Sequence, residues 1–135
     1  MTPDDNVKTV QKIYDAFGRG DVPAVLAQLG PELEIHEPES LPFGGVYRGP
    51  QGFLQLLSKI AETVRALEIK PERIFGQDDV VVVMSRLSGV VSGSPERVGT
   101  PLIERWTFRD GRPAELWAFY FDAAALTPAP PHAAA

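Results

Sequence analysis

The chain has 135 residues, 44% of them hydrophobic and 23% charged, and its formal net charge is −5. These values are typical of one water-soluble globular domain, and the negative charge disfavours nucleic acid or an anionic membrane as a partner. The absence of cysteine excludes disulfides and thiol chemistry, and two histidines are too few for a histidine metal site. We therefore expect a cytoplasmic protein with no metal and no membrane-spanning segment.

The first half of the chain predicts three helices and one strand. Thr2 and Pro3 are typical of a helix start, and Asp21 is a suitable cap for a second helix that Gly30 ends. Apolar residues recur at helical spacing in each predicted helix, and they alternate in the predicted strand. In chain order we expect a helix over 3–17, a helix over 22–29, a strand over 33–37, a loop over 38–49 and a helix over 50–64.

The second half predicts a run of antiparallel strands. Asp110 and Gly111 form a strong hairpin signal between the last two strands. We expect strands over 66–75, 80–91, 102–109 and 114–122. Residues 1–126 are predicted to form one domain, and residues 127–135, rich in proline and alanine, are predicted to be disordered.

Helices followed by antiparallel strands predict an α+β fold. One apolar sheet face and three amphipathic helices indicate a cone-shaped domain, in which a strongly curved, mainly antiparallel sheet folds around the helices. Such a cone encloses a cavity between the helices and the sheet.

One carboxylate falls on an apolar strand face. Between residues 102 and 108 the even positions are Leu102, Glu104, Trp106 and Phe108. An ionised carboxylate is rarely buried unless it is paired or protonated. Glu104 is therefore either a member of a structural ion pair, with Arg86 as the expected partner, or a catalytic acid in a pocket. In the second case burial would raise the pKa of the Glu104 carboxyl.

Several short motifs, taken in order, resemble the nuclear transport factor 2-like superfamily, which includes ketosteroid isomerase, limonene epoxide hydrolase and SnoaL-like polyketide cyclases. Each motif is weak alone, but together they span nearly the whole chain. They are Tyr14-x-Ala16-Phe17-x-x-Gly20-Asp21, Glu37-Pro38, Gly45-x-Tyr47-x-Gly49-Pro50-x-Gly52-Phe53, Trp106-x-Phe108-x-Asp110-Gly111-Arg112 and Trp117-x-x-Tyr120-Phe121-Asp122.

The resemblance implies roles for two carboxylates. Glu37-Pro38 is similar to the Asp-Pro pair that supplies the general base of ketosteroid isomerases, although a strand-end carboxylate can equally lean into solvent. Glu104 falls where those isomerases carry a protonated aspartate, kept neutral by an apolar site, that donates a hydrogen bond to the enolate. Tyr14 is offset by one position from the isomerase tyrosine, which corresponds to Ile13, so it either reaches the cavity or packs in the core.

Aromatic side chains at alternate strand positions indicate a cavity suited to a flat apolar ligand. We expect a small, flat, hydrophobic molecule in a cavity, with Glu37 and Glu104 as catalytic residues of a cofactor-independent isomerase or aldol-type cyclase. The alternative is a non-catalytic binding or assembly module in which Arg86 pairs with Glu104. A homodimer through the outer face of the sheet is expected in either case. The predicted ligand-binding residues are Tyr14, Phe17, Phe53, Leu57, Met84, Arg86, Trp106, Trp117 and Phe119.

Overall fold

The computed structural model describes residues 2–128 and contains three α-helices, six strands and a short 3-10 helix in that range. The predicted tail from residue 129 onward lies outside the described residues. In chain order the elements are α1 (Pro3–Gly18), α2 (Val22–Gln28), β1 (Glu34–Glu37), β2 (Gly45–Arg48), α3 (Gly49–Thr63), β3 (Val64–Gln77), β4 (Val80–Val91), β5 (Arg97–Arg109), β6 (Arg112–Tyr120) and η1 (Ala123–Leu126).

The first helix begins where the sequence predicts. The Thr2 hydroxyl accepts a hydrogen bond from the Asp5 amide at 3.1 Å, and the Asp5 carboxylate accepts one from the Thr2 amide at 3.1 Å. This reciprocal capping satisfies two backbone donors that a helix start otherwise leaves unpaired. Val10, Ile13 and Ala16 form the buried side of α1, as the helical spacing requires.

The six strands form one mixed sheet in the order β2-β1-β6-β5-β4-β3. β1 and β6 are parallel and all other neighbours are antiparallel, so the prediction of a mainly antiparallel sheet is confirmed. Two irregularities in the pairing of β3 with β4 interrupt the register. Such bulges bend a strand and increase its twist, which lets the sheet curve around the helices.

The loop predicted over 38–49 is partly wrong, because β2 lies within it. This strand has four residues, occupies the edge of the sheet and pairs only with β1. Its half-exposed residues carry no alternation of apolar and polar side chains that could indicate a strand. β5 also begins earlier than predicted, at Arg97, where its partner is Val90 of β4.

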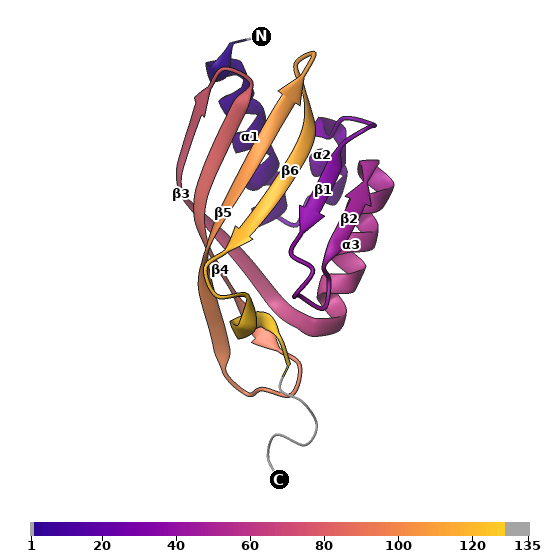
Figure 1. Cartoon of the computed structure of the whole chain (residues 1–135), viewed down its shortest axis with the longest axis vertical. Coiled ribbons are helices and arrows are strands. Elements are labelled where there is room, and N and C mark those ends of the chain that lie inside the picture. Colours follow the sequence, from indigo (N-terminus) through magenta and orange to yellow (C-terminus); the bar gives the residue numbers. More distant parts are fainter. Residues whose placement is uncertain (1, 129–135) are drawn as a thin grey trace.

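The three helices cover one face of the sheet (Figure 1). α1 contacts β3 and β4, whereas α3 contacts β1, β2 and β3. Side chains from the inner sheet face and from the helices share one core, which includes Ile35, Val83, Leu102 and Trp106. The predicted α+β architecture of helices packed on a curved sheet is thus confirmed, and the sheet is not closed into a barrel.

The outer face of the sheet exposes several large apolar side chains. Met84 of β4, Ile103 of β5 and Phe119 of β6 are each between 40% and 49% exposed. Among residues 2–128, no helix is both long enough and apolar enough to cross a membrane.

Candidate functional site

A pocket of about 70 Å³ lies between the helices and the inner face of the sheet. Its walls are almost entirely apolar, and the described residues that line it include two carboxyl groups and two tyrosines but no lysine, arginine or histidine. The polar members are Tyr14 of α1, Glu37 of β1, Glu104 of β5 and Tyr120 of β6, and Trp106 of β5 adds its indole.

Glu104 ends a hydrogen-bonded chain of three side chains. The Trp106 indole nitrogen donates to the Tyr14 hydroxyl oxygen at 3.0 Å, and the Tyr14 hydroxyl donates to Oε1 of Glu104 at 2.7 Å. The rings of Tyr14 and Trp106 meet edge to face with centroids 6.1 Å apart. This packing and the alternation of β5 together place Glu104 in the pocket, where it is 8% exposed.

Glu37 is the last residue of β1 and is held by a second tyrosine. The Tyr120 hydroxyl lies 2.9 Å from Oε1 of Glu37, and the Tyr120 ring packs edge to face on Phe43 with centroids 6.4 Å apart. Glu37 is 8% exposed, since it shares the inward face of its strand with the buried Leu33 and Ile35. The alternative that Glu37 leans into solvent is therefore wrong.

Both carboxyl groups have strongly raised pKa values. Burial, reinforced by the nearby charge of Glu104, raises the pKa of Glu37 to about 8, although its hydrogen bond with Tyr120 opposes the rise. Burial also raises the pKa of Glu104 to about 7, against the opposing hydrogen bond from Tyr14. Burial and the neighbouring carboxyls raise the pKa of both Tyr14 and Tyr120, so the two hydroxyls stay protonated.

Five of the nine predicted ligand-binding residues line the pocket with the two carboxyls. These residues are Tyr14, Phe17, Phe53, Leu57 and Trp106. The helical residues among them come from α1 and α3, whose apolar sides face the sheet. The pocket is therefore built from segments that lie far apart in the sequence.

The other four predicted residues lie on the opposite face of the sheet, which is a correction. In β4 the odd positions 81, 83, 85 and 87 are buried, so Met84 and Arg86 face outward. In β6 the inward residues are Leu116, Ala118 and Tyr120, so Trp117 and Phe119 face outward. The predicted ion pair between Arg86 and Glu104 is therefore wrong, because successive strand residues point to opposite faces.

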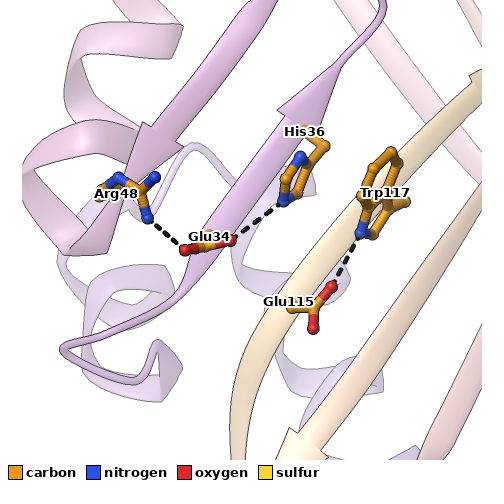
Figure 2. A network of polar contacts seen from close by, with 5 residues as sticks. All are labelled: Glu34, His36, Arg48, Glu115 and Trp117. Carbon is orange, nitrogen blue, oxygen red and sulfur yellow. Dashed lines mark hydrogen bonds and ion pairs between the residues drawn. The ribbon is translucent and has the colours of Figure 1, made fainter.

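The two outward residues of β6 belong to an aromatic and charged surface. Trp117 stacks on His36 with centroids 3.9 Å apart, and the Arg105 guanidinium lies 5.6 Å from the Trp117 ring centre and 6.0 Å from that of Phe119. Figure 2 shows this neighbourhood, where Glu34 of β1 contacts both His36 and Arg48, and the Trp117 indole donates to Glu115 at 2.9 Å. The outer face of β6 thus carries more aromatic side chains than its inner face.

Tyr120 is a pocket residue to which the sequence alone assigns no role. It belongs to the motif Trp117-x-x-Tyr120-Phe121-Asp122, and its place three residues after Trp117 puts it on the other side of the strand. Because Trp117 is predicted to line the pocket, this parity places Tyr120 on the outer face, and the error in the one assignment causes the error in the other. Within residues 2–128, no group of three or more histidine, aspartate or glutamate side chains could hold a metal ion.

Comparisons with known proteins identify the fold and the family. No curated protein matches the chain. An NTF2-like protein of unknown function from Burkholderia pseudomallei is 21% identical, with a TM-score of 0.82 over 92% of this chain and 98% of that one. An NTF2-like protein from Burkholderia xenovorans is 26% identical, with a TM-score of 0.78 over 93% of this chain and 95% of that one.

TerC, whose structure was determined with polyporic acid, is 22% identical, with a TM-score of 0.80 over 89% of this chain and 94% of its own. Less similar chains of the same fold include an epoxide hydrolase and a putative hydroxylase, so the fold does not set the reaction. The family model of the SnoaL-like domain matches residues 10–116. The chain therefore belongs to the SnoaL-like domain family.

Proposed function

We propose that this protein is an enzyme that moves a proton beside a carbonyl group of a small, flat, hydrophobic substrate. It would act as an isomerase or as an aldol-type cyclase, with no cofactor. The observation that carries the proposal is the pair of buried carboxyls, Glu37 and Glu104, which face one apolar pocket and whose pKa values are raised to about 8 and about 7. Acid–base groups are most effective when their pKa lies near the working pH.

The raised pKa values supply both partners that the chemistry needs. Between about pH 7 and 8 the pair holds roughly one proton, so that one carboxyl is ionised while the other is protonated. The ionised carboxylate takes a proton from the carbon next to the carbonyl, and the C–H electron pair moves into the enolate. The protonated carboxyl donates a hydrogen bond to the enolate oxygen.

The enolate can then react in two ways. Return of the proton to a different carbon gives an isomer and restores the carboxylate. Attack of the enolate carbon on a second carbonyl of the same molecule forms a ring, and the new alkoxide takes the proton instead. Tyr14 and Tyr120 remain protonated in the pocket, where the site has a low dielectric, and their hydroxyls hold the two carboxyls by hydrogen bonds.

The alternative is a non-catalytic module of the same fold that binds a hydrophobic ligand or takes part in assembly. The pocket volume of about 70 Å³ is well below the roughly 300–1,000 Å³ of typical small-molecule sites, which favours an assembly role over catalysis and over ligand binding. A flat polycyclic substrate would require the half-buried Phe53 and Leu57 of α3 to move.

Solvent exchange distinguishes the two functions even when the product is unidentified. Steroids, polyketide fragments and other flat carbonyl compounds are screened for thermal stabilisation, and stabilising compounds are then incubated with the protein in D₂O. We expect deuterium at the carbon beside the carbonyl. The rate should fall roughly 100-fold or more in Glu37→Gln and in Glu104→Gln, while binding persists.

Glu39→Gln is the matched control, because Glu39 is an exposed carboxyl two residues from Glu37. It should exchange deuterium as the wild type does. Compounds that bind tightly but acquire no deuterium would support the binding module instead. Unchanged exchange in both pocket variants would reject the catalytic roles.

We also propose that the protein forms a homodimer through the outer face of the sheet. The support is the exposed apolar surface of Met84, Ile103 and Phe119, which belongs to the three adjacent strands β4, β5 and β6. Contiguous apolar surface of this kind is characteristic of protein interfaces.

A further inference from the structure

We infer that Glu104 is the carboxyl that takes the substrate proton and that Glu37 is the carboxyl that already carries a proton. Tyr14 and Trp106 are positioning residues that make Glu104 ionise before Glu37. The catalytic roles rest on the proposed function, whereas the order of ionisation belongs to the protein alone. The roles are the reverse of those that the resemblance to ketosteroid isomerases implies.

The hydrogen bond on Glu104 has a fixed direction. An indole N–H can only donate, so the Trp106 nitrogen 3.0 Å from the Tyr14 oxygen makes that oxygen an acceptor. Tyr14 has one hydroxyl proton, and the remaining partner of its hydroxyl is Oε1 of Glu104 at 2.7 Å. Tyr14 therefore donates to Glu104, because among the described residues no other side chain accepts its buried proton. A donated bond to a carboxylate is stronger than one to a neutral acid, so this chain favours the ionised form of Glu104.

The hydrogen bond on Glu37 has no such constraint. Its partner is the Tyr120 hydroxyl at 2.9 Å, and no side chain among the described residues donates to the Tyr120 oxygen. The Tyr120 hydroxyl can rotate to donate to an ionised Glu37 or to accept from a protonated one. Glu37 can thus hold a proton on its bonded oxygen without breaking a hydrogen bond.

Nothing else that faces the pocket alters this asymmetry. The pocket residues from α2, α3, β3 and β4 are apolar, and the polar groups of the pocket are the five side chains already described. Burial gives both carboxyls raised pKa values, and the order of these values, about 7 for Glu104 and about 8 for Glu37, agrees with the direction of the hydrogen bonds. Once Glu104 is ionised, its charge holds the proton on Glu37.

The assignment fixes how a substrate would lie. Its acidic C–H group must face Glu104, beside Tyr14 and Trp106. Its carbonyl oxygen must face Glu37 and Tyr120. One O–H proton of this pair makes the hydrogen bond between them, and the other can be donated to the enolate oxygen. Glu37 keeps its own proton while it stabilises the enolate. The proton that is removed from the substrate carbon is transferred to the Glu104 carboxylate.

Carboxyl NMR of the substrate-free protein tests the order of ionisation. Glutamate is labelled with ¹³C at the side-chain carboxyl, the two signals are assigned with Glu37→Gln and Glu104→Gln, and each is followed from pH 4 to pH 10. We expect Glu104 to ionise at the lower pH. Tyr14→Phe and Trp106→Phe should raise the midpoint of Glu104, by roughly one pH unit for Tyr14→Phe. Tyr120→Phe, the matched control, should leave Glu104 ionising first.

Ionisation of Glu37 before Glu104 in the wild type would overturn the assignment. An unmoved Glu104 midpoint in Tyr14→Phe would also overturn it, and this variant decides the matter if Trp106→Phe does not fold. For a substrate found by deuterium exchange, the acidic limb of kcat/KM should move to higher pH in Tyr14→Phe, which a merely structural role would not cause. Absence of any exchange would reject the proposed function, whereas the NMR midpoints would still decide the order.

Discussion

Replacement of Glu37 by glutamine should stabilise the protein, and the gain should grow as the pH rises. Glutamine keeps the size of the side chain and an oxygen that can accept from the Tyr120 hydroxyl, but it cannot ionise. Burial raises the pKa of Glu37 in the folded protein from its ordinary 4.5 to about 8. The folded state therefore binds this proton more tightly than the unfolded state.

The pH window and the magnitude follow from that difference. Below about pH 4.5 Glu37 is protonated in both states, so it costs nothing. Between pH 4.5 and pH 8 the unfolded state is ionised while the folded state keeps the proton, so wild-type stability falls as pH rises. The 3.5 pH units that separate the two values correspond to about 5 kcal/mol at 1.36 kcal/mol per unit, most of it acquired between pH 5 and 8.

Urea unfolding measured by circular dichroism at pH 5, 6, 7 and 8 checks this result. The free energy of unfolding of Glu37→Gln, minus that of the wild type, should rise by about 3–4 kcal/mol across the series. Glu39→Gln should show no comparable rise. A difference between Glu37→Gln and the wild type that stays constant from pH 5 to pH 8 would refute the reasoning, because a buried carboxyl with a raised pKa cannot give that result.

Two further substitutions test the packing and the assembly. Gly30→Ala should lower the free energy of unfolding by about 1–3 kcal/mol in urea titrations, because its methyl group would meet the Pro113 carbonyl oxygen at 2.5 Å. Gly18→Ala, whose methyl group meets nothing within 4 Å, should be neutral or stabilising, and equal effects of the two would contradict this account. The wild type should have the mass of a dimer in light scattering and Phe119→Asp that of a monomer. A wild-type monomer at high protein concentration would reject the proposed interface.

Local sequence signals predict most of the helices and strands. The Thr2 cap, the Asp110–Gly111 turn and the alternation in β5 each depend on residues close together in the chain, and each appears at its predicted place. β2 escapes prediction because an edge strand of four residues is stabilised by its pairing with β1 rather than by its own pattern.

The pattern within a single strand is enough to single out Glu37 and Glu104 as candidate pocket residues, but it does not identify the side chains that contact them. Glu104 and Glu37 each share a strand face with buried apolar residues, and that parity can be read from the sequence. Alternation within one strand does not show which residues of the neighbouring strand lie on the same face of the sheet. The predictions that Arg86 pairs with Glu104 and that Trp117 and Phe119 line the pocket are therefore wrong, since all three lie on the outer face.

The amino-acid pattern alone is thus enough for the fold class, for every helix and strand except β2 and η1, and for the place of Glu104 on an apolar strand face, because spacing, capping and alternation are properties of a single segment. It leaves the burial of Glu37 open. The hydrogen bonds that Tyr14 and Tyr120 make to the two carboxyls follow from the packing of the whole domain. Those contacts join residues 90 and 83 positions apart. Their existence depends on how α1, β1, β5 and β6 pack together, and that packing is a property of the whole domain.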